Sequence, residues 1–341
     1  MRFGVALPTC VEGMAYPIRL ADHEGIARLA KHAEAVGFDS VLVNDHMSTM
    51  PYVREQFASP PRFYEPMVML TYLAGVTSRV RLQTGVVVLP MREPVLLAKQ
   101  VSVIDRICGG RVTLGVGVGA YRAEFASVYP ARAKIPRGEL VAEGIEALGL
   151  LFSQRRATYR GKHFQFEDVE LYPKPVQDPF PIYSCGNADG TIRRAASAGA
   201  GWMPAGMPLP KLADGVARLR AYAQEAGRGE ARIEVAPQLV LCLGRDPDAA
   251  TANFLSSQAH EHLVSLSAST LRGFDPAGFA AQNLIGSPEQ VVERILTLQA
   301  VGTTELAGLI VVADSESEMA DQMSMFAEEV IPAFAEEGAH Q

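Results

Sequence analysis

The stretch "RVTLGVGVGAYRAEF", from Arg111 to Phe125, decides the fold class of this chain of 341 residues. A run rich in β-branched residues passes into a glycine-rich turn, and the residues after the turn could begin a helix. Gly115, Gly117 and Ala120 fit the G-x-G-x-x-G/A spacing of a dinucleotide-binding turn. In an open doubly wound sheet that turn normally follows the first strand, so its place along the chain separates two architectures.

Short β-rich segments alternate with helical patterns along almost the whole chain, which indicates a parallel sheet built from βα units. We read strands at residues 2–7, 40–45, 80–90, 111–119, 181–186, 201–206, 232–244 and 305–313. The glycine turn follows the fourth of these strands. The sequence therefore predicts an α/β fold, a closed (β/α)8 TIM barrel that forms a single domain over residues 1–341.

Two segments depart from the alternation and are expected to be insertions. Residues 156–175, roughly, alternate aromatic and polar side chains around Gly161, which predicts a β-hairpin outside the barrel. Residues from about 265 to 286 follow no clear period and are expected to be irregular. Pro237 predicts a bulge or a break in the seventh strand, and Ser287, Pro288 and Gln290 fit the start of a helix with a capping box.

Composition limits the classes of partner. The formal net charge is -7 and no long run of like charges occurs, which argues against a nucleic-acid surface or a polybasic membrane anchor. No apolar run approaches the roughly 18 residues of a membrane-spanning helix, and the amino terminus lacks a signal-peptide pattern. The four cysteines are widely spaced and are interpreted as reduced thiols. We expect a soluble, cytoplasmic protein that acts on a small molecule.

In a TIM barrel the reacting groups gather at the carboxyl ends of the strands. Asp45 and His46 end the second strand, and an imidazole there can donate to a ring carbonyl or move a proton near neutral pH. Gly85 interrupts the third strand. It either forms a bulge that helps to close the barrel or lets the backbone approach a flat ligand.

Two further segments point to a bound cofactor. The glycines of the opening stretch either make room for a planar ring or allow close packing of strand and helix. In "CGNADGT", Asp189 or Gly190 could cap the next helix, whose free N–H groups would bind a phosphate with the Thr191 hydroxyl. An ordinary helix start is the alternative, and Arg193 and Arg194 are expected to face solvent. The histidines show no metal-ligand spacing, so no metal site is predicted.

These segments together resemble the bacterial luciferase-like family of flavin- and deazaflavin-dependent oxidoreductases. The resemblance rests on "FGVALP", "GFDSVLVNDH", the region from "LQTGVVVLP" to "GVGAYRAEF", "GNADGTIRRAASAGAGWMP" and "IGSPEQVVERI", in that order. It implies an isoalloxazine-type ring over the third and fourth strands, a non-prolyl cis peptide at Gly85–Val86, an active-site histidine at His46, and a phosphate loop that includes Gly186, Asn187 and Thr191.

The expected site follows from the strand ends and the resemblance together. His46 is the catalytic candidate, and Tyr121 and Met207 are weaker candidates for the substrate pocket. The expected cofactor-binding residues are Asp45, Gly85, Val86, Gly117, Gly119, Cys185, Gly186, Asn187, Gly190 and Thr191. Val118 and Ala120 replace the basic or acidic residue of some family members, which argues against a sugar-phosphate substrate. Glu124 is interpreted as a structural carboxylate.

The first functional hypothesis is a monooxygenase that uses reduced FMN and O2 to oxidise a small organic substrate, with a separate flavin reductase as partner. The second is hydride transfer with the deazaflavin coenzyme F-420. The branch of the family that the chain resembles favours the deazaflavin, whereas the acidic balance and the lack of a basic cluster for its anionic tail favour FMN. A non-catalytic flavin-binding accessory protein is a third possibility, and a homodimer is expected.

Overall fold

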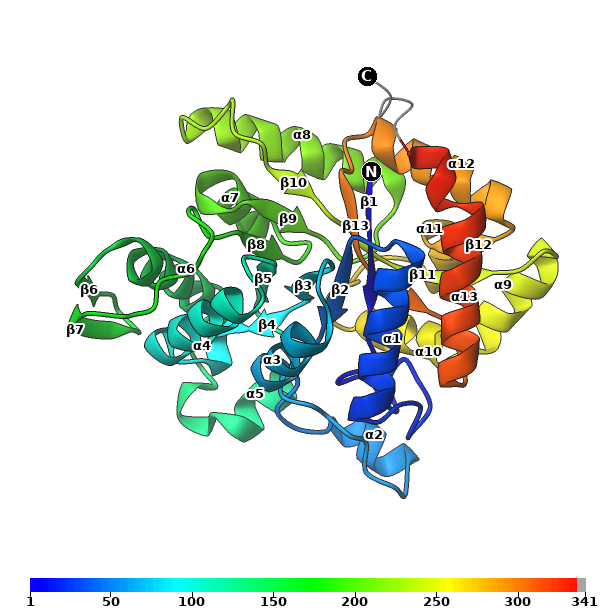
Figure 1. Ribbon diagram of the computed structural model, residues 1–341, viewed down its shortest axis with the longest axis horizontal. Helices are drawn as coiled ribbons and strands as arrows, with labels where there is room; N and C mark the ends of the chain where they lie inside the picture. Colours follow the sequence, from blue (N-terminus) through cyan, green and yellow to red (C-terminus); the bar gives the residue numbers. More distant parts are fainter. Residues whose placement is uncertain (336–341) are drawn as a thin grey trace.

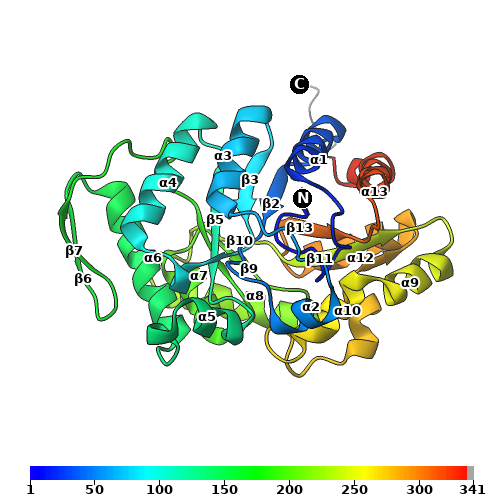
Figure 2. The ribbon, with the colours of Figure 1, turned by 90° about the horizontal axis from the view of Figure 1, so that it is seen from below.

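The computed structural model describes residues 1–335 as a curled parallel sheet surrounded by helices (Figures 1 and 2). The strands of this sheet are β1 (Arg2–Ala6), β2 (Ser40–Val43), β3 (Arg81–Thr84), β4 (Val87–Val88), β5 (Val112–Gly117), β8 (Ile182–Cys185), β9 (Gly201–Met203), β10 (Glu234–Val235), β11 (Gln238–Leu243), β12 (Leu284–Gly286) and β13 (Glu305–Val311).

The order of neighbouring strands is that of a TIM barrel. It runs β10-β9-β8-β5-β3-β2-β1-β13-β11-β12, every pair is parallel, and β4 continues the third strand beside β5. A bridge between Ala205, just after β9, and Gln238 of β11 joins the two sides of the sheet. The predicted (β/α)8 fold is therefore confirmed, and the glycine turn does follow the fourth strand.

Helices cover the outside of the sheet. They are α1 (His23–Val36), α2 (Pro51–Gln56), α3 (Pro66–Val76), α4 (Pro94–Ile107), α5 (Arg122–Val128), α6 (Arg137–Ser153), α7 (Asp189–Ala198), α8 (Leu209–Glu225), α9 (Pro247–Ser256), α10 (Gln258–Leu266), α11 (Phe279–Gln282), α12 (Pro288–Ala300) and α13 (Glu316–Glu329). Among the described residues no helix is long and apolar enough to cross a membrane. Three of them, α2, α5 and α10, lie on the lower side of Figure 1, toward which β1 points.

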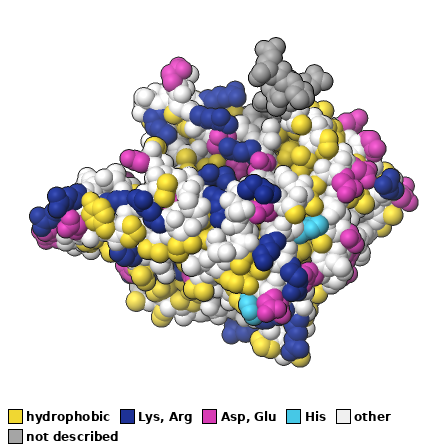
Figure 3. Space-filling view, in the orientation of Figure 1, with side chains coloured by type: hydrophobic (Ala, Val, Ile, Leu, Met, Phe, Trp, Pro, Cys, Tyr) yellow, Lys and Arg dark blue, Asp and Glu magenta, His cyan; other side chains and the backbone are white. Residues whose placement is uncertain are grey.

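Most local predictions are confirmed. The hairpin of β6 (Ala157–Arg160) and β7 (Gln165–Val169) protrudes from the body, where side chains of both charges mark its tip (Figure 3). Pro237 separates β10 from β11, and Ser287 forms the predicted capping box.

The structure corrects two expectations. Ala188 precedes α7 and no side chain caps this helix, because Asp189 is its first residue and pairs with Arg193 and Arg218 instead. The segment 265–286 is more regular than predicted, since it contains α11 and also β12, which pairs with β11. Such short elements show too few residues for a period to be recognised.

Gly115 in the fourth strand allows close packing against the third strand. All six residues of β5 are buried, and a Cβ on Gly115 would lie only 2.1 Å from the Thr84 carbonyl oxygen of β3. The Thr84 hydroxyl also donates a hydrogen bond to the Gly115 carbonyl oxygen at 2.8 Å. Gly115 therefore allows close contact between strands, whereas Gly117 and Gly119 lie nearer the cavity described below.

We predict that Gly115→Ala lowers the free energy of unfolding by about 2–3 kcal/mol, because the methyl group meets backbone that cannot move aside. Gly149→Ala is the matched control, since Gly149 lies on the exposed face of α6 with nothing within 4 Å of the new methyl group. That substitution should raise stability by about 0.5–1 kcal/mol. Urea unfolding measures both, and equal stability of the two variants would contradict the prediction.

Candidate active site

Two adjoining cavities open at the carboxyl ends of the strands. The inner cavity has a volume of about 190 Å³ and the outer cavity about 1080 Å³. Their common wall is formed by Val118, Gly119, Ala120, Tyr121, Cys185, Gly186 and Thr270. The predicted residues after the second, third, fourth and fifth strands thus come together in one region, as a parallel barrel requires.

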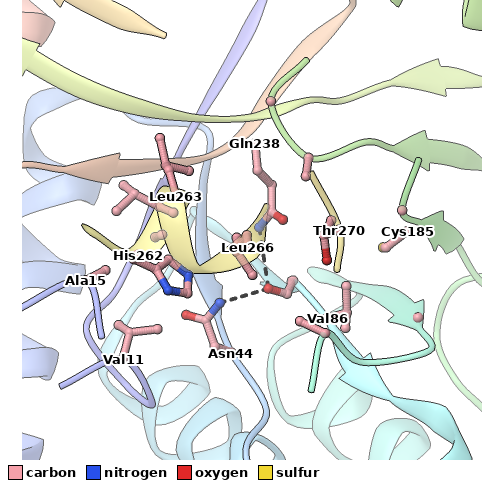
Figure 4. A pocket seen from close by; sticks show the side chains of 18 of the residues that line it. Val11, Ala15, Asn44, Val86, Cys185, Gln238, His262, Leu263, Leu266 and Thr270 are labelled. Atoms are coloured by element: carbon pink, nitrogen blue, oxygen red, sulfur yellow. Dashed lines mark hydrogen bonds between the residues drawn. The ribbon is translucent and has the colours of Figure 1, made fainter. Parts of the chain in front are cut away.

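The floor of the inner cavity is fixed by hydrogen bonds to one carbonyl group. The Gly85 carbonyl oxygen accepts from the Asn44 side-chain amide at 2.8 Å and from the Gln238 amide at 3.4 Å (Figure 4). The Gly85–Val86 peptide bond is cis, as the family resemblance implies, and both residues line the inner cavity. A Cβ on Gly85 would lie 2.4 Å from a methyl group of Leu42, so any larger residue would require the Leu42 side chain to move.

Asp45 is buried behind this floor. Its carboxylate accepts two hydrogen bonds from Arg92, the shorter at 2.6 Å, and one from the Val88 backbone N–H at 2.9 Å. A buried carboxylate needs such partners. Both oxygens of Asp45 are therefore occupied in holding β4 beside the cavity, although the residue is part of the cavity wall.

His46 forms a pair with Glu124, which lies at the start of α5. The His46 Nδ1 atom is 2.9 Å from one carboxylate oxygen, and the other oxygen accepts from the backbone N–H groups of Met47 and Ser48. Nδ1 is therefore the protonated nitrogen, since a carboxylate with these donors acts as an acceptor. Glu124 does more than the structural role predicted for it, because it fixes the orientation of His46 at the wall of the inner cavity.

Tyr121 links the start of α5 to helices α2 and α10. Its hydroxyl lies 3.3 Å from the Tyr52 hydroxyl of α2 and 3.4 Å from the Ser265 hydroxyl of α10. Burial is the main cause that raises the pKa of Tyr121 above its usual value, so the phenol stays neutral. Tyr121 contacts both cavities as predicted, whereas Met207 contacts the outer cavity.

The segment predicted to bind phosphate lies at the outer cavity. Gly186 has a φ of 123°, Asn187 bonds the Ala205 N–H, and the Thr191 hydroxyl accepts from Arg194 at 3.2 Å. All of these except Arg194 line a cavity. Gly190, also predicted here, is exposed and lines neither cavity.

Arg194 is half-buried rather than solvent-facing as predicted. Burial lowers the pKa of its guanidinium group, its Nε atom is buried without a hydrogen-bond partner, and no carboxylate among the described residues forms a salt bridge with it. An arginine in this state remains charged. Its positive charge next to Thr191 and the uncapped start of α7 is therefore available to an anion.

The rim of the outer cavity is basic. Five cationic side chains and one acidic side chain line it: Arg122, Arg137, Lys211, Arg218, Arg272 and Asp214. Asp214 and Arg218 pair with each other at 3.1 Å. Because Arg122, Lys211 and Arg272 form no salt bridge among residues 1–335, the rim carries uncompensated positive charge. This cluster corrects the expectation that the chain has no basic group for an anionic tail.

Sequence reasoning missed several residues of the inner cavity. Asn44 and Gln238 hold the floor, Asn283 comes from the segment before β12, and His262 and Thr270 come from α10 and the loop after it. Asn44 could have been found, because it directly precedes Asp45 at a strand end. The others lie at the start of β11, in α10 or in the segment 265–286, where no motif marks them.

We predict that Glu124→Gln reverses the protonated nitrogen of His46, because an amide N–H in place of the carboxylate oxygen requires Nδ1 to accept. Nitrogen-15 NMR of histidine side chains would show the proton move from Nδ1 to Nε2. Glu139→Gln is the matched control, since Glu139 lies 2.9 Å from Nε2 of His163 on the surface hairpin. It should leave His46 unchanged, and an unchanged His46 in Glu124→Gln would refute the proposed pairing.

Comparisons with known proteins agree with the fold. The family model described as luciferase-like monooxygenase matches residues 1–305. An F420-dependent glucose-6-phosphate dehydrogenase of Kineococcus radiotolerans is 29% identical over 238 residues, which cover 67% of this chain and 66% of that protein. An FMNH2-dependent dimethylsulfone monooxygenase of Pseudomonas putida is 26% identical over 301 residues, which cover 81% of this chain and 79% of the relative.

A solved structure of similar fold matches this chain over almost its full length. The monooxygenase RslO1 of Streptomyces bottropensis superposes with a TM-score of 0.79 at 25% identity, covering 98% of this chain and 100% of that chain. The sequence relatives named above depend on two different coenzymes, F420 and FMNH2. The chain belongs to the luciferase-like monooxygenase family, whose members are flavin- or F420-dependent oxidoreductases.

Proposed function

We propose that this protein is an F420-dependent oxidoreductase that transfers hydride to or from a small organic substrate. The observation that carries the proposal is the basic rim of the outer cavity, where Arg122, Lys211 and Arg272 have no carboxylate partner among the described residues. Coenzyme F-420 has a longer anionic tail than the phosphate of FMN. A rim of unpaired cations attracts a long anionic chain more than it attracts one phosphate group.

The cavities fit a deazaflavin. Gly117 and Gly119 leave the wall of the inner cavity free of side chains, and a Cβ on Gly117 would come within 3.2 Å of Val86. Thr191, the start of α7 and the nearby positive charge of Arg194, which has no carboxylate partner among the described residues, suit a phosphate group. The ring would thus lie over Val86, and the charged chain would extend along the basic rim.

When bound, the coenzyme supplies the hydride chemistry. The protein's own contribution is to exclude water, to orient the substrate and to handle a proton. The Nδ1–H group of His46 donates a hydrogen bond to Glu124, which leaves Nε2 as the nitrogen that can accept a proton from a substrate hydroxyl. The apolar walls of the inner cavity limit competing water.

The substrate differs from that named for the Kineococcus relative. No lysine or arginine lines the inner cavity within the part of the chain that the structure describes. A sugar phosphate would therefore have no cation for its phosphate group there, and a buried unpaired charge is costly. We infer a substrate without a phosphate group.

The FMN-dependent monooxygenase is the second candidate function. Its support is the largely apolar inner cavity, which suits an oxygen-derived intermediate that water would destroy, together with the likeness to RslO1 and to the dimethylsulfone monooxygenase. A separate flavin reductase would then be the partner. The two candidates use the same ring site and differ in the coenzyme that the rim selects.

Anaerobic titrations with reduced F-420 and with reduced FMN separate the candidates. We expect the deazaflavin to bind at micromolar concentration and at least tenfold more tightly than FMN. Tighter binding of FMN would favour the monooxygenase, and binding of neither would contradict both candidate functions.

At low salt, the triple variant Arg122→Gln, Lys211→Gln, Arg272→Gln should weaken F-420 binding by about tenfold and FMN binding by less. Low salt is used because salt screens exposed charges. The matched control replaces Arg155, Arg156 and Arg160 of the distant hairpin with glutamine. Equal effects of the two triple variants would contradict a role of the rim.

His46→Ala should reduce turnover by about 100-fold, because a positioned proton-transfer group typically contributes at least that factor. Glu124→Gln should lower turnover in the same direction, since it leaves Nε2 protonated and unable to accept. Stopped-flow absorbance of the coenzyme measures both rates. Full activity of His46→Ala would assign the histidine a structural role only, and Glu139→Gln again serves as control.

A further inference from the structure

Helix α10 brings an unexpected histidine to the inner cavity. His262 lines this cavity together with Leu263 and Leu266 of the same helix. Figure 4 shows its imidazole reaching inward from α10, on the side of the cavity where Asn44 and Val11 lie. Neither the hydride-transfer scheme nor the coenzyme site described above uses this side chain.

The Nδ1 atom of His262 is buried and has no hydrogen-bond partner. Among the polar side-chain atoms of described residues that line the inner cavity, the Tyr16 hydroxyl is the other such case. Buried polar atoms are seldom left without a partner, because they lose their hydrogen bonds to water. A molecule in the cavity can supply the missing partner.

His262 is a neutral group in the folded protein. Burial is the main cause that lowers its pKa to about 4, and the nearby charge of His46 acts in the same direction. A neutral imidazole offers one N–H donor and one lone-pair acceptor. It can therefore bond a hydroxyl or a carbonyl group, and it gives no charge for an anionic substrate to bind.

The surroundings define the rest of the ligand. The apolar side chains of the inner cavity include Val11, Ala15, Leu239, Val240, Leu263, Leu266, Leu271 and Ile310. Three of the amide side chains near them are already satisfied: Asn44 and Gln238 bond Gly85, and Asn283 bonds the Val240 N–H and the Phe279 carbonyl oxygen. A mostly apolar molecule with one free oxygen matches this lining.

We propose that His262 is a substrate-binding residue, whose Nδ1 hydrogen-bonds the oxygen of a neutral, mostly apolar alcohol or ketone held in the inner cavity near His46. This inference rests on the proposed function, because it takes the inner cavity as the place of the substrate. His262 thereby determines specificity for an oxygen-bearing compound over a hydrocarbon of the same shape, since an unpaired polar group discriminates strongly.

The test uses the protein loaded with oxidised coenzyme F-420, with cyclohexanone as probe and methylcyclohexane as its apolar counterpart. Oxidised coenzyme and a ketone do not react, so binding is measured alone. Nitrogen-15 NMR of labelled histidine side chains should show the His262 Nδ1 signal shift with cyclohexanone and stay in place with methylcyclohexane. His262→Leu identifies that signal by its loss.

Substitutions of His262 then test whether binding depends on the position of the polar atom or only on the presence of a polar group. The amide of asparagine lies close to the place of Nδ1, whereas the amide of glutamine reaches the place of Nε2. We expect His262→Asn to keep most of the affinity for cyclohexanone, and His262→Gln and His262→Leu to lose about tenfold. His260→Asn is the matched control on the same helix, where His260 packs edge-on against Phe254 outside the inner cavity.

Three results would overturn the inference. The first is no binding of cyclohexanone, and the second is equal binding by wild type and His262→Leu. The third is a loss of coenzyme affinity in His262→Leu, which would assign the histidine to the coenzyme ring. Coenzyme binding is followed separately by deazaflavin fluorescence. If the fluorescence shows that F-420 does not bind the wild type, the proposed function fails. The same ketone titration with FMN-loaded or coenzyme-free protein still decides the role of His262.

Discussion

The close contact between the third and fourth strands at Thr84 and Gly115 is the constraint from which the active-site region follows. No side chain fits between these strands at that level, and the hydroxyl of Thr84 fastens β5 to β3. One residue further along, the third strand breaks at Gly85, whose carbonyl group is held by Asn44 and Gln238. The strand ends consequently leave a flat slot instead of a packed layer of side chains.

The polar groups around that slot fall into two kinds. Those that shape the walls are paired: Asp45 binds Arg92, and Glu124 binds His46 and two backbone N–H groups. Others keep a buried nitrogen atom without a hydrogen-bond partner among the described residues, namely Nε of Arg194 beside Thr191 and Nδ1 of His262. Since unpaired buried groups are disfavoured in a folded chain, the second kind marks where bound molecules complete the structure.

The same arrangement explains how one barrel can serve either coenzyme of its family. Under the proposed function, the glycine-lined slot and the start of α7 would accept a ring and a phosphate, which both coenzymes have. Selectivity then depends on charges further out, where the rim is formed by loops and helices that follow several different strands. Such loops change without disturbing the barrel, because the strands beneath them carry the core.

The sequence by itself determined the alternation of strands and helices, the place of the glycine turn after the fourth strand, the hairpin around Gly161 and the capping box at Ser287. These are local patterns of hydrophobic period and turn chemistry, which few residues specify. Only the tertiary structure decided that Glu124 holds His46, that the rim is basic despite the acidic chain, and that α10 brings His262 into the inner cavity. Each of these features depends on residues that are distant along the chain. A local sequence pattern does not show which side chains the barrel brings into contact.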